Sequence, residues 1–176
     1  VPVAWGHAKL STLWKNKGSK KDATTYRGLS IGSSLCKIAV CIILSRLSGW
    51  YNAQLSEEQQ GFRPNRGATR GTQDAILTAK RVQQLAYNMK KSVYCAFIDL
   101  TAAFDTINRD WLFTSIQARL LKIQGVENLN VLRGLYANTS AHLSQDPEKV
   151  PFITKAGVRQ GGPESPPLFC LFMDWV

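Results

Sequence analysis

The feature that most constrains the fold is a short, almost unbroken apolar segment near the middle of the chain. Residues 92–98 contain the run VYCAFI, and Asp99 follows it directly. A continuous apolar run of this length is typical of a strand that is buried on both faces of a sheet. We therefore expect residues 92–98 to form a central strand. Asp99 would then lie at the end of that strand, where ligands commonly bind in open α/β sheets.

Strand-like and helix-like patterns alternate along the rest of the chain. Further strands are predicted at 4–14, 26–32, 141–143 and 152–158, and helices at 34–55, 72–89, 108–122, and from about 126 and 165. The first of these helices carries apolar residues at helical spacing, namely Leu35, Ile38, Ala39, Ile42, Ile43 and Leu47. This order predicts an α+β fold with some α/β character. A chain of 176 residues is expected to form one domain.

The charge is strongly positive and unevenly distributed. The net charge is +10, and residues 1–70 hold 11 basic against three acidic side chains, whereas residues 71–176 hold 11 against nine. A basic half joined to a nearly neutral half suggests a polyanion lying on one side of the molecule, although a merely solvated basic surface gives the same count. No apolar run reaches the roughly 18 residues of a membrane helix, so no membrane partner is expected.

The basic residues gather in two segments. Lys15 and Lys17 belong to a predicted turn, KNKGSKKDATT, and Arg27 lies on the strand after it. Cationic groups near a hairpin tip can hold a triphosphate or a nucleic-acid backbone, but a charge run is more often a solvated face. The second segment, EEQQGFRPNRG, contains Phe62, Arg63 and Arg66, in which an aromatic ring beside a guanidinium offers a base a stacking surface.

The candidate chemistry lies at two aspartates and one loop. Asp99 is either a ligand of a hard divalent cation or an ordinary turn aspartate. Asp105 is either a second ligand or the cap of the helix that starts near Asn108, and we favour the cap. In the segment GVRQGGPESPPLF, residues 157–169, Gly157, Gly161 and Gly162 permit positive φ and close backbone approach to a ligand, and Arg159 and Gln160 add polar side chains. By itself this segment is also consistent with an ordinary Gly/Pro turn.

The four cysteines indicate neither a zinc site nor a disulfide framework. They show no CxxC spacing, they lie in apolar surroundings, and only two histidines accompany them. We expect four buried free thiols.

Taken in order, four segments resemble successive motifs of reverse transcriptases, in particular those of the non-LTR, LINE-type retrotransposon branch. They are KNKGSKKDATTYRGLSIGSS, EEQQGFRPNRG, AFIDLTAAFDTINR and GVRQGGPESPPLF. The resemblance implies the fingers and an incomplete palm of a right-hand polymerase, with residues 1–91 as fingers and fingers–palm helices and residues 92–176 as partial palm.

The resemblance also implies roles for individual residues. Asp99 matches the catalytic aspartate that binds metal, and Leu100 the residue whose carbonyl joins it. Phe104 matches the position that screens the sugar 2′ carbon. The nucleotide would further contact Lys15 or Lys17, Arg27, Gln160 and Gly161, and the template strand would contact Phe62, Arg63 and Arg66. Asp105 belongs to the family pattern but is not expected to bind metal.

The implied activity is RNA-directed DNA synthesis with Mg²⁺ or Mn²⁺, an RNA template, a DNA primer and deoxynucleoside triphosphates. An endonuclease domain would lie elsewhere in the parent polyprotein, and the protein would work in the cytoplasm and nucleus as a ribonucleoprotein. No aspartate pair follows residue 163, so we expect a partial domain that is inactive by itself. The alternative is a non-catalytic nucleic-acid-binding remnant of a decayed mobile element.

Overall fold

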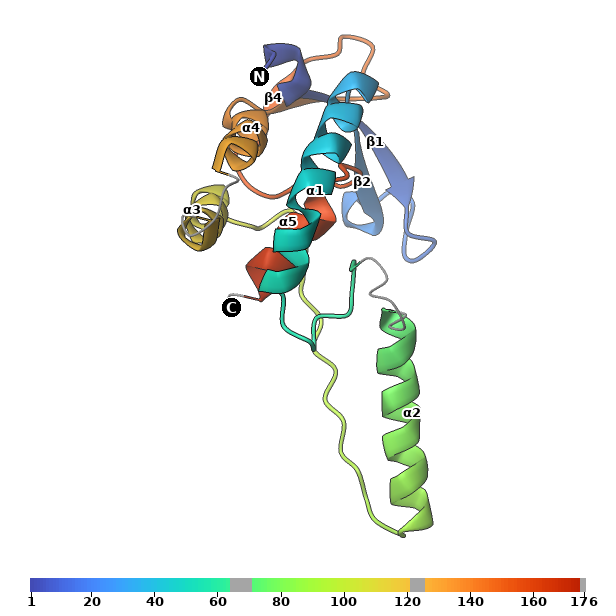
Figure 1. Cartoon of the computed structure of the whole chain (residues 1–176). Helices are drawn as coiled ribbons and strands as arrows, with labels where there is room; N and C mark the ends of the chain where they lie inside the picture. The colour runs from blue at the N-terminus through green and yellow to red at the C-terminus, as the bar shows by residue number, and fades with distance from the viewer. Residues whose placement is uncertain (64–70, 121–125, 175–176) are drawn as a thin grey trace.

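The computed structural model describes residues 1–63, 71–120 and 126–174. These residues form a mixed α and β structure, which confirms the predicted α+β class (Figure 1). A four-stranded sheet lies beside a group of helices, and one further helix projects away from both.

The sheet joins strands from the two ends of the chain. β1 (His7–Trp14) and β2 (Tyr26–Ile31) form the predicted antiparallel hairpin, β3 (Ser140–Leu143) lies parallel to β1, and β4 (Phe152–Ile153) is antiparallel to β3. The strand order is therefore β2-β1-β3-β4. Two expected strands are shorter than predicted, because residues 3–6 form a 3₁₀ helix, η1 (Val3–Gly6), and the chain after Ile153 leaves the sheet.

The core lies among four helices. These are α1 (Ser34–Gln54), α3 (Arg109–Leu120), α4 (Val126–Ala137) and α5 (Ser165–Met173). Their buried side chains form one cluster, in which Leu112, Leu120 and Cys170 are completely enclosed. Burial of such apolar surface is the main force that holds these helices together.

The buried face of α1 differs from the predicted one. Its buried side chains are Cys36, Val40, Ile43, Leu47 and Tyr51. Leu35, Ile38 and Ile42, which were predicted for the core, are at least half exposed. Because apolar residues occur around most of this helix, their spacing alone does not identify the face that packs. The helix is also long and apolar enough to cross a membrane by length and composition, a test that a core helix of a soluble protein also passes.

Residues 92–98 do not form the expected central strand. The segment is extended, belongs to no strand and lies outside the sheet. Tyr94 and Phe97 are 95% and 96% exposed, and Ile98 is 88% exposed. The prediction was wrong because an apolar run is buried only where other elements cover it, and among the described residues no strand pairs with this one.

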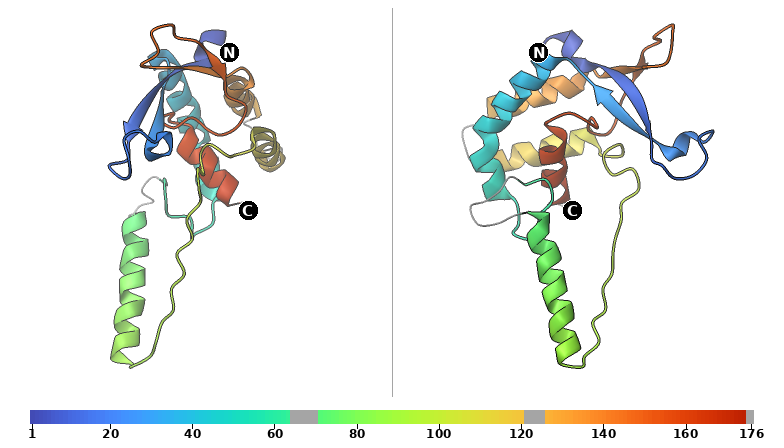
Figure 2. Two further views of the ribbon diagram at one scale, coloured as in Figure 1. Left: turned by 180° about the vertical axis from the view of Figure 1, so that it is seen from behind. Right: turned by 90° about the vertical axis from the view of Figure 1, so that its right-hand side faces the viewer.

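α2 (Thr72–Asn88) also stands apart from the core. It projects from the rest of the molecule in every view, and the chain returns along residues 91–100 (Figures 1 and 2). None of its side chains is buried, although Ile76, Leu77 and Leu85 are apolar. The helix and the extended segment therefore form an arm with little tertiary packing.

The cysteines divide into two pairs. All four are free thiols, as expected, but only Cys36 and Cys170 are buried. Cys41 and Cys95 are exposed because they lie on the outer face of α1 and on the extended segment.

Candidate active site

The loop of residues 157–163 connects three parts of the fold. Gly157 N donates to Ile107 O at 2.8 Å, Val158 N donates to Phe104 O at 2.7 Å, and Ser30 N donates to Gln160 O at 2.7 Å. The loop thus joins β2 to the segment that precedes α3. Three regions of the chain that resemble polymerase motifs meet here.

Two glycines make this close packing possible. Gly157 has φ +77° and Gly161 has φ +104°, both in the region that favours glycine. A Cβ atom on Gly157 would lie 2.7 Å from the backbone of Phe104 and Asp105. A Cβ on Gly161 would lie 2.8 Å from the Leu29 side chain of β2. The glycines predicted for close approach therefore approach the protein's own backbone and side chains.

Asp105 is held by Gln160. The Gln160 Nε2 atom donates to both carboxylate oxygens, at 3.2 and 3.1 Å. The favoured prediction that Asp105 caps the next helix was wrong, because Asn108 Oδ1 accepts from Trp111 N at 2.9 Å and so caps α3. The sequence identified Asp105 and Gln160 as candidates. It did not reveal that they pair, because they are 55 positions apart.

Arg109 fixes the chain that enters the loop. Its guanidinium donates to the carbonyls of Thr154, Ala156 and Gly157 at 2.7 to 2.9 Å, and to the Thr139 hydroxyl at 2.7 Å. Partial burial lowers the pKa of Arg109 from its usual value. Arg109 was not predicted, since its place at the end of the third motif is the only local feature that marks it.

A buried polar network supports the other end of the loop. The Tyr136 hydroxyl donates to Glu164 Oε1 at 3.0 Å, and both residues are almost fully enclosed. The Arg159 guanidinium donates to Leu135 O and Trp5 O at 2.9 and 3.0 Å. Burial, reinforced by the Glu164 charge, raises the pKa of Tyr136, so the hydroxyl keeps the proton that it donates. Arg159 was predicted as a cationic fork of this segment, but Tyr136 and Glu164 were not predicted, because their partners are distant in the sequence.

Phe104 belongs to an aromatic cluster. Its ring stacks on Phe169 of α5 with centroids 4.7 Å apart, and Phe62 meets it edge-on at 6.0 Å. Phe62 itself is exposed and has φ +56°, an uncommon value for a bulky residue. The cluster brings the predicted sugar-screening residue next to a predicted template residue.

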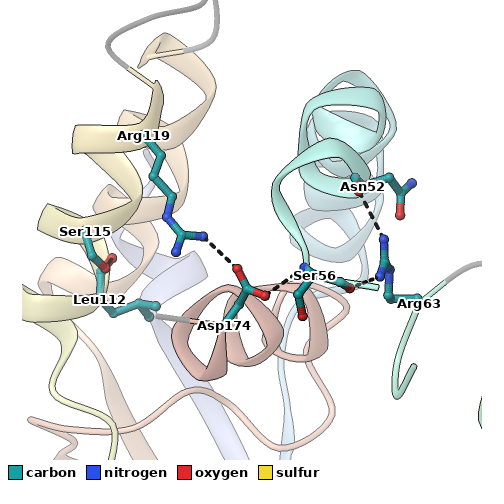
Figure 3. A network of polar contacts seen from close by, with 7 residues as sticks. All are labelled: Asn52, Ser56, Arg63, Leu112, Ser115, Arg119 and Asp174. Carbon is teal, nitrogen blue, oxygen red and sulfur yellow. Dashed lines mark hydrogen bonds and ion pairs between the residues drawn. The ribbon is translucent and has the colours of Figure 1, made fainter. Parts of the chain in front are cut away.

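The Arg63 guanidinium is occupied by the protein's own backbone. It donates to Gln59 O and Asn52 O at 3.0 and 3.1 Å, and also to Ser56 O (Figure 3). Ser56 N in turn donates to Asp174 Oδ1 at 2.8 Å. Arg63 thus links the end of α1 to its own loop, and its predicted contact with the template stays a prediction. Arg66 lies outside the described residues.

The basic hairpin is well formed. Asp22 accepts from Thr24 N at 2.9 Å, a bond that lowers the pKa of its carboxyl and caps the 3₁₀ helix η2 (Ala23–Thr25). Lys15 Nζ donates to Thr24 O at 2.8 Å, whereas Lys17 is exposed. Arg27 is exposed on β2 and shares its strand face with Leu29, which touches Gly161. Two predicted nucleotide contacts, Arg27 and Gly161, therefore belong to neighbouring segments.

Asp99 and Leu100 lie at the end of the exposed extended segment. In the part of the chain that is described, no hydrogen bond or ion pair holds the Asp99 carboxylate. Mg²⁺ is usually bound by one or two carboxylates together with substrate phosphates and water. Among the described residues, no three His, Cys, Asp or Glu side chains gather. Asp99 can serve as one protein ligand of such an ion. The described residues do not supply the ligands of a complete two-metal centre.

Known proteins resemble this chain along almost its whole length. Residues 17–176 match the family model described as reverse transcriptase (RNA-dependent DNA polymerase). The chain is 25% identical to a Pol polyprotein of the retrotransposable element R2 from Popillia japonica, over 99% of this chain and 23% of that protein. It is 28% identical to a Pol polyprotein of element R2DM from Drosophila melanogaster, over 88% of this chain and 14% of that protein. It is 26% identical to a probable RNA-directed DNA polymerase from transposon BS of the same organism, over 97% of this chain and 18% of that protein. The chain thus spans less than a quarter of each of these relatives.

Proposed function

Because the chain belongs to the reverse transcriptase (RNA-dependent DNA polymerase) family, we propose that it forms the fingers and part of the palm of a retrotransposon's RNA-directed DNA polymerase. The observation that carries this proposal is the junction of β2, the 157–163 loop and the Phe104–Asp105 segment. At this junction, three regions of the chain that carry family motifs lie next to one another.

The proposed reaction is nucleotidyl transfer to a primer. The primer 3′ hydroxyl attacks the α-phosphate of a deoxynucleoside triphosphate, a new phosphodiester bond forms, and pyrophosphate leaves. Arg27, together with Lys15 or Lys17, neutralises the triphosphate charge, since cationic side chains stabilise transferring phosphoryl groups. A divalent ion, Mg²⁺ or Mn²⁺, supplies further charge neutralisation in such reactions. Asp99 and the Leu100 carbonyl would contribute to holding it.

The remaining predicted residues position the substrates. Gln160 and Gly161 contact the incoming nucleotide and the template base, and the Asp105 carboxylate orients the Gln160 amide. Phe104 screens the sugar, and Phe62 supports the template beside it. Template base pairing selects the nucleotide, so the protein needs only sequence-independent contacts to the strands.

The test is nucleotide-dependent binding to a primer–template duplex. We expect the chain to bind an RNA template annealed to a DNA primer, and the complementary deoxynucleoside triphosphate to tighten that binding in Mg²⁺, as measured by fluorescence anisotropy. Arg27→Ala removes the proposed triphosphate contact and should abolish the tightening. Arg133→Ala, at an exposed arginine of α4, is the matched control and should keep it. Equal tightening in both variants would refute the role of Arg27.

The second candidate is a nucleic-acid-binding remnant without catalysis. The isolated Asp99 carboxylate favours it, because one carboxylate does not complete a metal centre. Both candidates bind nucleic acid through salt-sensitive contacts. Primer extension by the longer parent protein separates them, since only the polymerase incorporates nucleotides. The endonuclease domain and the ribonucleoprotein in cytoplasm and nucleus belong to the first proposal alone.

A further inference from the structure

The two histidines of the chain meet on the sheet. The sequence holds only His7 and His142, which are 135 positions apart. In the parallel pairing of β1 and β3, His7 lies opposite Ser140, and Lys9 lies opposite His142. All four residues occupy one face of the sheet, because side chains two positions apart along a strand point the same way. The two imidazoles are therefore diagonal neighbours on that face.

The side chains of Ser140, His7 and His142 form a row that is linked by hydrogen bonds. His7 Nδ1 lies 2.6 Å from Ser140 Oγ, and His7 Nε2 lies 3.2 Å from His142 Nδ1. The two rings are 5.3 Å apart and nearly parallel. When both rings are neutral, a single proton lies between the two facing nitrogens. A metal ion can take the place of that proton.

We propose that His7 and His142 chelate one transition-metal ion, such as Zn²⁺, at a site separate from the polymerase centre. Two nitrogens that bind one zinc ion tetrahedrally at about 2.0–2.1 Å lie about 3.4 Å apart. The observed 3.2 Å is close to this separation, and the two rings would turn until both nitrogen lone pairs point at the metal. In the tautomer that binds metal, His7 Nδ1–H donates a hydrogen bond to Ser140 Oγ and the lone pair of Nε2 faces His142, which is the usual role of a group behind a metal-binding histidine.

The rest of the coordination shell is water. An open groove of about 890 Å³ is lined in part by His7, Ser140 and Thr139. Among the described residues no third metal-binding side chain joins the two, and Lys9 on the same face adds positive charge. The site is therefore weaker than zinc sites with three or four protein ligands. Imidazole selects Zn²⁺, Cu²⁺ or Ni²⁺ over Mg²⁺, so the site does not compete with a polymerase metal.

Bound metal would clamp two strands from opposite ends of the chain. β1 and β3 share a short ladder of four residue pairs, so a link between them restrains separation of the sheet. A ligand that binds only the folded state raises its stability.

Isothermal titration with Zn²⁺ tests the site. The background carries Cys41→Ser and Cys95→Ser, because exposed thiols also bind zinc. With Mg²⁺ in excess, at about pH 7.5, we expect one zinc ion per chain and a higher melting temperature that a chelator reverses. His142→Ala should abolish binding, and Ser140→Ala should weaken it about tenfold.

Two further variants keep the result interpretable. Gln145→Ala removes an exposed neighbour that contacts Thr12 on the same sheet, and it should bind zinc normally. His7→Gln keeps an amide donor toward Ser140 and serves if His142→Ala does not fold, as judged by circular dichroism. Binding that survives in a folded histidine variant, or its absence in the Cys-to-Ser background, would overturn the proposal. Neither result bears on polymerase function.

Discussion

At the scale of single residues, the loop of residues 157–163 depends on side chains that satisfy backbone groups. Arg109 donates hydrogen bonds to the chain between β4 and the loop. The Tyr136–Glu164 pair lies where the loop leads into α5. A buried polar group that loses its hydrogen-bond partner costs free energy. Each of these side chains therefore stabilises the polar groups to which it is bonded. The loop is therefore held in place by the protein before any substrate arrives.

Arg109 offers the sharpest test of this support. Arg109→Ala leaves the carbonyls of Ala156 and Gly157 without a donor, while Thr154 O keeps its bond from the Thr139 hydroxyl. We expect a loss of about 2–4 kcal/mol in the free energy of unfolding. Arg109→Lys should recover little, because an ammonium group cannot reproduce the planar fork. Urea denaturation measures both. The exposed Arg133→Ala should change stability by less than about 0.5 kcal/mol. A neutral Arg109→Ala would show that water replaces the guanidinium.

At the scale of elements, α1 and the arm formed by α2 and residues 91–100 differ in packing. One face of α1 is enclosed by α4 and α5, and the opposite face is exposed. α2 has no buried side chain, so its helical state rests on local interactions. Isolated helices of this length are only marginally stable in water.

Thiol reactivity reports the packing of α1. Cys41 and Cys95 should react rapidly with a disulfide reagent, whereas Cys36 and Cys170 should react only on unfolding. Burial raises the pKa of Cys36 and of Cys170, so both remain protonated and unreactive to higher pH than a free thiol. Counting fast and slow thiols spectrophotometrically, with Cys36→Ser and Cys41→Ser for assignment, checks the pattern. A rapid Cys36 would mean that the opposite face of α1 packs.

Hydrogen exchange tests the arm. Amides of α2 should exchange much faster than those of α3, because opening α2 exposes no buried apolar surface. Mass spectrometry of peptides that cover 72–88 and 109–120 gives the comparison. Equal protection of the two helices would indicate that α2 is covered in solution, for instance by another molecule.

At the scale of the whole molecule, one sheet unites the basic N-terminal hairpin with strands from the C-terminal half. The proposed division into fingers before residue 91 and palm after it remains a prediction, and the sheet crosses that boundary. Among the described residues, six basic side chains lie on β1, β2 and their connecting turn, and Lys37 and Arg46 lie on α1. A polyanion would therefore meet the hairpin first.

The salt dependence of RNA binding measures this contact. Each phosphate contact that is lost reduces the slope of log K against log salt by about 0.7 to 0.9. Lys17→Ala, at an exposed position of the hairpin, should reduce the slope by about that amount. Lys149→Ala, in the exposed turn between β3 and β4, should leave it unchanged. Identical slopes in the two variants would place the nucleic acid elsewhere.

Local patterns in the sequence were enough to predict the hairpin of β1 and β2, the helices and the family motifs. Turn residues, strand alternation and helical spacing act between near neighbours, so they can be seen without a fold. The sequence also predicted that Gly157 and Gly161 adopt backbone angles that favour glycine, although their close contacts are with the protein's own chain and the prediction was contact with a ligand.

Tertiary structure alone decided the features that depend on distant partners. It selected the buried face of α1, left residues 92–98 exposed, paired Asp105 with Gln160, and brought His7 to His142. Apolar character measures how much a segment gains by burial, but burial also requires a surface to cover it. That surface is assembled from residues far apart in the chain, and so no local pattern contains it.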